Sequence, residues 1–88
     1  MTIKQIKYAI AIAETGSMSK AASRFGVKQP SISTAIAELE YELDTKLFER
    51  TARGMTVTKG GRQFLSETLR LCQSIEQMEN RYRVAVLK

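Results

Sequence analysis

The sequence predicts a mostly α-helical fold of three short helices, a two-stranded β wing and one long final helix. Residues 17–43 contain two amphipathic segments joined by a tight turn at Gly26. Residues 46–58 alternate apolar and polar side chains around a second glycine-containing turn, as short hairpins do. From Thr58 onward, apolar side chains recur at intervals of four and three, which is typical of a long helix that packs against another.

Residues 2–15 form the first predicted helix. Thr2 followed by Gln5 fits a capping box, in which each side chain accepts a hydrogen bond from the other residue's backbone amide. Gly16 can end the helix, since glycine adopts the left-handed conformation without a side-chain clash. The face predicted to point into the core is formed by Ile3, Ile6, Ile10 and Ala13, with Tyr8 and Ile12 widening it.

The next two segments have the pattern of a helix-turn-helix pair. Ser17 can cap the first helix and Gly26 can end it. The apolar face of this helix carries Met18, Ala21, Ala22 and Phe25. Pro30 is tolerated in the first turn of the second helix, because its missing N–H would have no partner there. Such a pair alone is weak evidence of function, since any small helical bundle contains one.

The second helix of the pair, residues 29–43, has two different faces. An apolar sector about 60° wide is expected to face the core and is formed by Ile32, Ile36, Leu39 and Leu43. The opposite side and its N-terminal shoulder carry Gln29, Pro30, Ser33, Thr34, Ala37 and Tyr41. These side chains are mostly small or hydrogen-bonding, so we expect this face to approach nucleobases closely, whereas a solvated helix more often carries Lys and Glu.

Charge is distributed unevenly along the chain. Fourteen Lys and Arg against nine Asp and Glu give a net charge of +5, which suits a polyanion without distinguishing DNA, RNA or an acidic membrane. The charged residues among residues 1–36 are all basic except for Glu14, whereas acidic residues outnumber basic ones in residues 37–49. This order suits a helix that enters a DNA groove by its N-terminus; the alternative is scattered solvated charge. The acids expected to form a solvated face are Glu38, Glu40 and Glu42.

Several classes of protein are disfavoured. One cysteine and no histidine rule out an internal disulfide and a His-containing metal site. No apolar run approaches the roughly 20 residues of a membrane span, and the N-terminus lacks the apolar stretch of a secretory signal, so we expect a cytoplasmic protein. The sequence contains neither a nucleophile–base set nor a phosphate-binding glycine loop, so we do not expect an enzyme. We predict no metal and no cofactor in this chain.

The segment after Leu43 predicts the wing. Lys46–Arg50 and Met55–Thr58 read as two strands around the turn at residues 51–54. Arg53 at the tip can reach a DNA minor groove, whose negative potential attracts arginine. Arg50 is better placed for a phosphate or an internal acid, and either arginine could instead be a solvated loop charge. With this wing after the three helices, residues 1–58 are predicted to form a winged helix-turn-helix domain.

Residues 59–88 are predicted to form a linker and dimerisation helix. Thr58 can cap it. A heptad seam runs through Phe64, Thr68, Leu71, Ile75, Met78, Tyr82 and Ala85. A small domain cannot bury so long a stripe alone, so we expect the same helix of a second copy to cover it. Cys72, which broadens the seam, is interpreted as a packing residue.

These patterns together resemble the N-terminal domain of LysR-type transcriptional regulators. The resemblance covers Ile3 to about Leu65 and rests on the ordered set Ala21-Ala22, Gln29-Pro30, Ser33, Ile36, Leu39-Glu40, Leu43, Leu47-Phe48, Arg50, Arg53, Thr58 and Gly61. It implies an activator or repressor, often tetrameric, whose small effector binds a domain absent here. The family often has Arg and Gln where this chain has Thr34 and Ala35, so a guanine contact would be lost. It usually has a large aromatic at Ala9, for which we expect Phe25 to compensate.

The expected function is sequence-specific binding of duplex DNA by a homodimer. Base contacts are predicted for Gln29, Pro30, Ser31, Ser33, Thr34 and Arg53, and backbone contacts for Lys4, Lys7, Lys28, Tyr41 and Arg50. The main alternative is a dimeric winged-helix module that binds protein through its last helix. RNA binding is disfavoured because the aromatic residues lie on core-like stripes rather than on a stacking platform.

Overall fold

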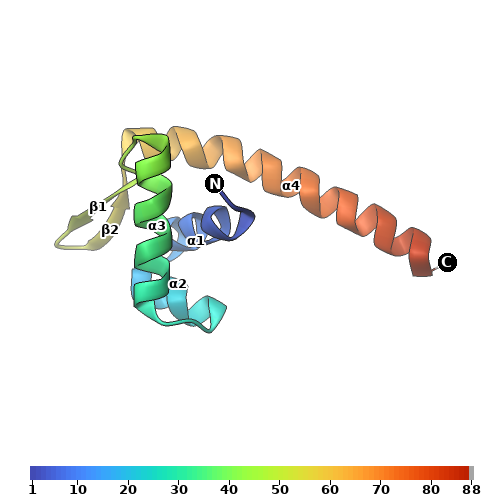
Figure 1. Cartoon of the computed structure of the whole chain (residues 1–88), viewed down its shortest axis with the longest axis horizontal. Coiled ribbons are helices and arrows are strands. Elements are labelled where there is room, and N and C mark those ends of the chain that lie inside the picture. The colour runs from blue at the N-terminus through green and yellow to red at the C-terminus, as the bar shows by residue number, and fades with distance from the viewer. Residues whose placement is uncertain (88) are drawn as a thin grey trace.

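The computed structural model describes the backbone of residues 1–87 and the side chains of residues 1–83. The elements in chain order are α1 (Ile3–Thr15), α2 (Met18–Phe25), α3 (Gln29–Leu43), β1 (Phe48–Thr51), β2 (Gly54–Val57) and α4 (Lys59–Leu87). The first three helices and the wing form a compact head, and α4 extends well beyond it (Figure 1). The predicted fold class is therefore confirmed.

Local signals set the ends of the helices as expected. The capping box at Thr2 is complete, and the side chain of Ser17 accepts a hydrogen bond from a backbone amide in the first turn of α2. Gly16 and Gly26 end α1 and α2 in the left-handed conformation, with φ of 70° and 65°. Helix α3 has no side-chain cap but carries Pro30 in its first turn. Each boundary follows from residues within one turn of it.

The buried face of α1 differs from the predicted one. Ile3 is 42% exposed, and Ile10 and Ala13 are only half-buried. The buried residues of α1 are Ile6, Tyr8, Ala9, Ala11 and Ile12. Helix α1 is packed against α2, α3, β2 and α4, so its buried face is broader than one stripe and includes two alanines that allow close approach. The prediction that Ile3 points into the core was wrong.

Phe25 was expected to compensate for the small side chain of Ala9, but it does not fill the core. Its side chain is 37% exposed, because it ends α2 at the edge of the head. The ring packs edge-on against Tyr8, with centroids 5.0 Å apart and planes at 72°. Ala9 is fully buried. Phe25 therefore packs on the surface of the core rather than filling its interior.

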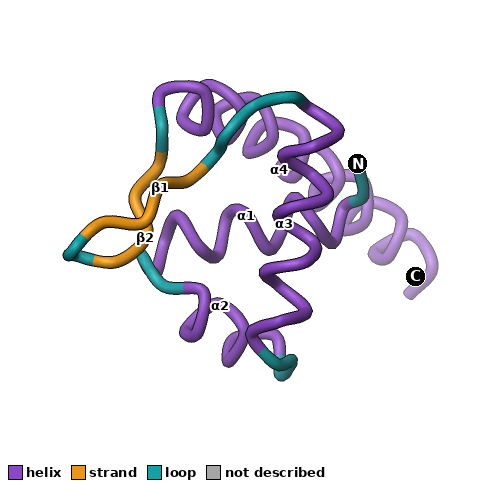
Figure 2. The backbone as a smooth tube through the Cα atoms, turned by 60° about the vertical axis from the view of Figure 1, so that its left-hand side comes forward, coloured by secondary structure: helices purple, strands orange, loops and turns teal. Residues whose placement is uncertain are grey.

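The wing is attached to the head through the α1–α2 turn. Strands β1 and β2 are antiparallel, pairing Phe48 with Val57 at the base and Thr51 with Gly54 at the tip. The amide of Met55 donates a hydrogen bond of 3.0 Å to the carbonyl of Gly16. Figure 2 shows β2 beside this turn. A backbone contact between distant segments thus holds the wing in place.

The sequence suggested that Glu40 belongs to a solvated acidic face, but the structure shows that it does not. Its side chain is 15% exposed, and Oε2 accepts hydrogen bonds from the amides of Leu47 at 2.7 Å and Phe48 at 3.4 Å. The ammonium of Lys46 lies 3.9 Å from the other carboxylate oxygen. Glu40 therefore joins α3 to the start of the wing.

Replacing Glu40 with alanine is expected to lower the free energy of unfolding by about 1.5–3 kcal/mol, the typical contribution of hydrogen bonds to a charged group. The amide of Leu47 would lose its partner in a part-buried site. Urea unfolding followed by circular dichroism measures the effect. The exposed Glu38 provides the control, since Glu38→Ala should change stability by no more than about 0.5 kcal/mol. Equal losses in the two variants would contradict the assigned role.

Helix α4 begins on the base of the wing. The hydroxyl of Thr58 accepts a hydrogen bond from the Gly61 amide at 2.9 Å and donates one to the Lys46 carbonyl at 2.5 Å. Leu65 and Thr68 are buried against the head, and Leu69 and Cys72 still line a hollow together with side chains of α1 and α2. Within residues 1–87, no helix combines the length and the apolar character that crossing a membrane requires.

Candidate nucleic-acid interface

The outward face of α3 begins at its first residue. Gln29, Pro30, Ser31, Ser33 and Thr34 are all exposed. The opposite side of the helix is buried through Ile32, Ile36 and Leu39, which are at most 2% exposed. Ala35 is half-buried against the core, so it does not belong to the exposed face. The head thus presents a neutral surface of small and hydrogen-bonding groups at the N-terminal end of α3.

The tertiary structure brings Arg50 close to Gln29. Both line a hollow of about 160 Å³ where the start of α2, the start of α3 and the wing meet. Ser17 and Ser19 line the same hollow. No acid within the described part of the chain makes an ion pair with Arg50. Of the two roles considered for Arg50, this position favours binding of a phosphate.

Arg53 lies at the tip of the wing, away from the head. It belongs to the two-residue turn between Thr51 and Gly54, and its side chain is exposed. Its amide donates a hydrogen bond of 3.2 Å to the Thr51 hydroxyl, which orders the turn. The wing therefore carries one arginine at its tip and another, Arg50, nearer the head.

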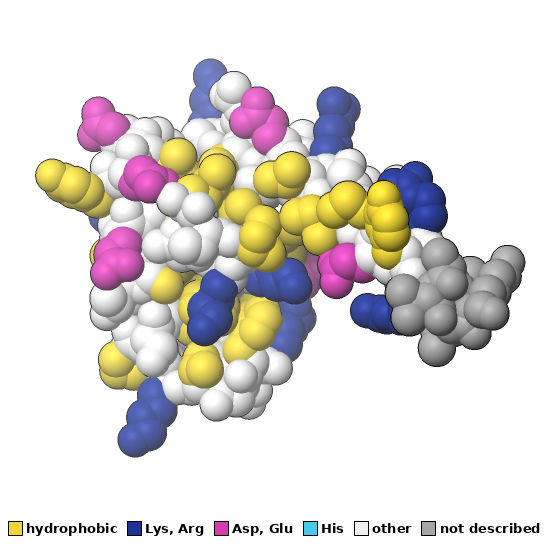
Figure 3. Space-filling view, turned by 45° about the vertical axis from the view of Figure 1, so that its right-hand side comes forward, with side chains coloured by type: hydrophobic (Ala, Val, Ile, Leu, Met, Phe, Trp, Pro, Cys, Tyr) yellow, Lys and Arg dark blue, Asp and Glu magenta, His cyan; other side chains and the backbone are white. Residues whose placement is uncertain are grey.

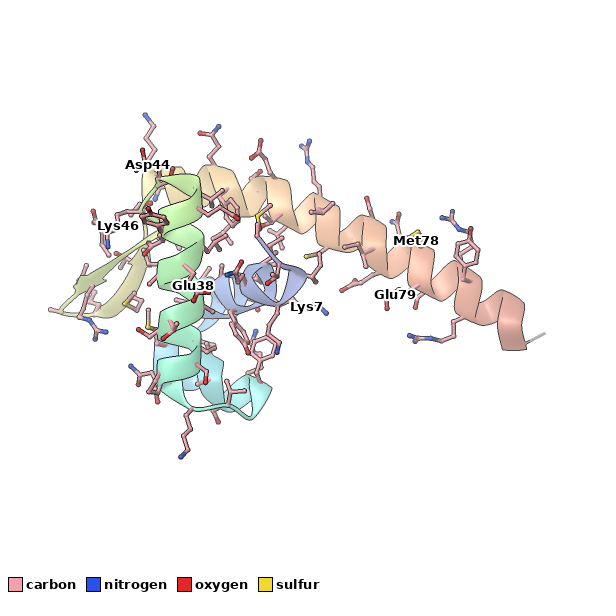
Figure 4. The ribbon with its side chains drawn as sticks, in the orientation of Figure 1. Lys7, Glu38, Asp44, Lys46, Met78 and Glu79 are labelled. Atoms are coloured by element: carbon pink, nitrogen blue, oxygen red, sulfur yellow. The ribbon has the colours of Figure 1, made fainter. Side chains whose placement is uncertain are left out.

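The remaining predicted phosphate contacts are exposed but do not share one face. Lys28 immediately precedes α3, and Tyr41 on α3 is 89% exposed. Lys4 is exposed on α1. Lys7 projects beneath α4, away from the wing, and lines a hollow there with Leu69 (Figure 4). The structure does not bring Lys7 together with the outward face of α3.

Acidic side chains follow toward the rear of α3. Glu38 lies in the middle of the helix and Asp44 ends it, in the left-handed conformation with φ of 48° (Figure 4). Glu42 is paired with the ammonium of Met1 at 2.6 Å. A polyanion would thus be attracted to the front of α3 and repelled from its rear.

The predicted dimerisation seam is only partly free. Thr68 is 4% exposed and Phe64 is half-buried against the core, because the seam crosses the head at this point. Thr68 is therefore a core residue, and its assignment to a dimer interface was wrong. Further along α4, Leu71, Met78 and Tyr82 are exposed and Ile75 is half-buried, and Figure 3 shows apolar surface along this part of the helix. Ala85 lies outside the residues whose side chains are described.

Comparison with known proteins identifies this arrangement. Residues 3–62 match the family described as "Bacterial regulatory helix-turn-helix protein, lysR family". The chain belongs to the LysR family. It is 39% identical over 85 residues to the HTH-type transcriptional regulator TfdT of Cupriavidus pinatubonensis and 41% identical over 85 residues to ClcR of Pseudomonas putida. Each match covers 97% of this chain but only 37% and 29% of those proteins.

Solved structures of LysR regulators have the same fold. The DNA-binding domain of CbnR in a complex with DNA matches with a TM-score of 0.88 and 38% identity, over 98% of this chain and 99% of that one. The corresponding domain of BenM bound to benA site 1 DNA matches with a TM-score of 0.89 and 31% identity, over 94% and 93%. This LysR-family chain is thus a regulator-type helix-turn-helix domain, and its relatives are regulators rather than enzymes.

Sequence reasoning missed two members of the hollow beside Gln29. Ser17 was recognised only as a cap, and Ser19 was not singled out. Because three distant segments form this hollow, no spacing within one helix could have revealed it. Arg50 was among the residues that carry the family resemblance, but the resemblance could not show that Arg50 lies beside Gln29.

Proposed function

We propose that this chain is the DNA-binding part of a transcriptional regulator and binds duplex DNA sequence-specifically as a homodimer. The observation that carries the proposal is the exposed neutral face of α3, which starts at Gln29 beside Arg50 and the wing. The similar domains of CbnR and BenM, solved with DNA, support it.

The N-terminal half of α3 enters the major groove. Gln29 pairs with N6 and N7 of an adenine, and Ser33 takes a base or a phosphate. Pro30, Ser31 and Thr34 touch the methyl group of a thymine. Thr34 cannot form the bidentate contact that arginine makes with guanine, because its side chain is short and uncharged. Arg53 enters the neighbouring minor groove from the tip of the wing.

Contacts with the DNA backbone set the position of α3 in the groove. Arg50 binds a phosphate next to Gln29, which fixes the reading side chain relative to the duplex. Lys28, Lys4 and Tyr41 bind further phosphates. Lys7 has no part in this surface, because it projects beneath α4.

Homodimerisation is proposed to involve the free part of α4. Leu71, Met78 and Tyr82 are 45%, 47% and 65% exposed, and a second copy would remove them from water. A two-fold dimer requires inverted half-sites, with recognition helices about one helical turn, roughly 34 Å, apart or a multiple of it. Since the chain spans about a third of its relatives' length, an effector domain, a tetramer and a cytoplasmic location are proposed for the longer protein.

Replacing Gln29 with alanine is expected to weaken operator binding by about 1–3 kcal/mol and to relax preference at one base pair. Lys28→Ala, the adjacent control, should weaken binding to all sequences alike and reduce the salt slope by about one. Footprinting on the DNA beside the protein's own gene would supply the operator, and titrations against operator and random duplex would measure both effects. If Gln29→Ala weakens both duplexes equally, Gln29 does not read a base.

Footprinting also separates DNA binding from the alternative of a protein-interaction module. A dimer on an operator protects a two-fold pattern of two half-sites. A module that binds only protein would protect no such pattern and would not distinguish operator from random duplex.

A further inference from the structure

One face of the wing is turned toward the head. Phe48 and Val57, which are paired at the base, belong to this face, since Phe48 is buried and Val57 packs against the core. Successive side chains of a strand point to opposite faces, so the next pair on the same face is Arg50 with Met55. Thr56, on the other face of β2, is exposed. The register of the hairpin thus places Arg50 beside Met55 on the side that faces the head.

Two methionines line the hollow that Arg50 shares with Gln29. Met55 is half-buried, packs against the core and lines this hollow. Met18, the first residue of α2, has the same three properties. None of the described residues that line the hollow carries a carboxylate. The surface next to Arg50 is therefore apolar thioether rather than acid.

We propose that Met55 and Met18 form an apolar floor that holds the side chain of Arg50 toward Gln29 and so positions its guanidinium for a DNA phosphate. This inference rests on the proposed function and adds two positioning residues that do not touch DNA themselves. The methylene stem of an arginine packs on apolar surface while its charged end stays in water. Directly opposed side chains of an antiparallel pair have Cβ atoms about 4.5–5.5 Å apart, so Met55 can cover the stem of Arg50.

The backbone beneath this floor is fixed. The amide of Met55 donates its hydrogen bond of 3.0 Å to the carbonyl of Gly16, two residues before Met18, so it joins the segments that carry the two methionines. Ordering a long side chain costs conformational entropy. An Arg50 stem that is already ordered in the free protein loses less entropy when the phosphate binds. The floor therefore increases affinity without a DNA contact of its own.

A double-mutant cycle on operator and random duplex tests this role. Arg50→Ala should raise the dissociation constant about tenfold or more, through loss of a charged hydrogen bond. It should also flatten the salt slope by about 0.9, the contribution of one phosphate. Met55→Ala should raise the constant about three- to tenfold and flatten the slope in part. The double variant should bind within about twofold of Arg50→Ala, because Met55 acts only through Arg50. Met55→Leu, which is similar in volume and apolar, should bind within about twofold of the original chain.

Val57→Ala is the matched control. Val57 lies on the same face of β2 and packs against the same core, but it does not line the hollow. This variant should lose stability without changing the salt slope, and any effect on the affinity of the folded protein should multiply with that of Arg50→Ala. Urea unfolding gives the folded fraction. If Met55→Ala behaves in the same way as Val57→Ala, Met55 only stabilises the fold and the inference is overturned.

NMR relaxation of the Arg50 Nε–H group tests the inference without DNA. Its order parameter should be high in the original chain and in Met55→Leu, fall in Met55→Ala and Met18→Ala, and stay unchanged in Val57→Ala. An Arg50 side chain that is equally mobile in all of these proteins overturns the inference and leaves DNA binding intact. A chain that binds neither duplex overturns the proposed function, and the order parameters still decide whether the methionines order Arg50.

Discussion

Replacing Gly61 with alanine is expected to lower the free energy of unfolding by about 2–3 kcal/mol, because α4 would be pushed off the wing. A Cβ atom at this buried position would lie 2.2 Å from the carbonyl oxygen of Leu47 and 2.9 Å from Cγ1 of Val57. The first of these is a backbone atom at the start of the wing, so rotating a side chain cannot relieve the clash. Urea unfolding measures the loss.

Gly60→Ala is the matched control for this prediction. Both substitutions improve intrinsic helix propensity by up to about 1 kcal/mol. At Gly60, however, the nearest atom is the Thr45 side-chain methyl at 2.8 Å, and the nearest backbone atom is 3.8 Å away. The Thr45 side chain can move, so this variant should stay within about 1 kcal/mol of the original. Equal destabilisation of the two variants would show that close packing at Gly61 is not the cause.

Replacing Gly54 with alanine should displace the wing from the head and destabilise the fold by about 3 kcal/mol. Gly54 has a φ of 112°, a conformation that side chains disfavour, and a Cβ there would lie 2.6 Å from the Gly16 oxygen. The same oxygen accepts the hydrogen bond from the Met55 amide. Under the proposed function, operator affinity of the folded fraction should fall at least as much as in Arg53→Ala, because the wing tip would be misplaced.

Gly26→Ala separates backbone strain from displacement of the wing. Gly26 also has a positive φ, of 65°, but a Cβ there would meet nothing within 4 Å. This variant should lose only about 1–2 kcal/mol and keep normal operator affinity once folded. Unfolding curves and fluorescence titrations with operator DNA provide the two readouts. Normal affinity in Gly54→Ala would mean that the Gly16 contact does not position the wing.

Most of the fold could be predicted from short stretches of sequence. The caps at Thr2 and Ser17 and the left-handed glycines at positions 16 and 26 act within one helical turn, so their pattern needs no knowledge of distant residues. The same holds for the apolar sector of α3. The division into domains at residue 58 stays a prediction.

The errors occurred where neighbours from elsewhere in the chain change a helix face. Ile3 fits the apolar stripe of α1, but the head does not cover that end, whereas Ala9 and Ala11 are buried because several elements pack there. Thr68 fits the seam of α4 and is nevertheless covered by the head. Periodicity gives the direction of a side chain around its own helix, not the identity of what lies opposite.

The candidate interface shows the same division between local and long-range effects. The neutral outward face of α3 and the arginines of the wing were readable from spacing and from the resemblance to LysR regulators. The hollow shared by Gln29 and Arg50, the anchoring of the wing by Glu40 and Gly16, and the close contact of Gly61 with Leu47 required the packed chain. Helix ends depend on atoms a few residues away, whereas these contacts join segments that only the folded core brings together.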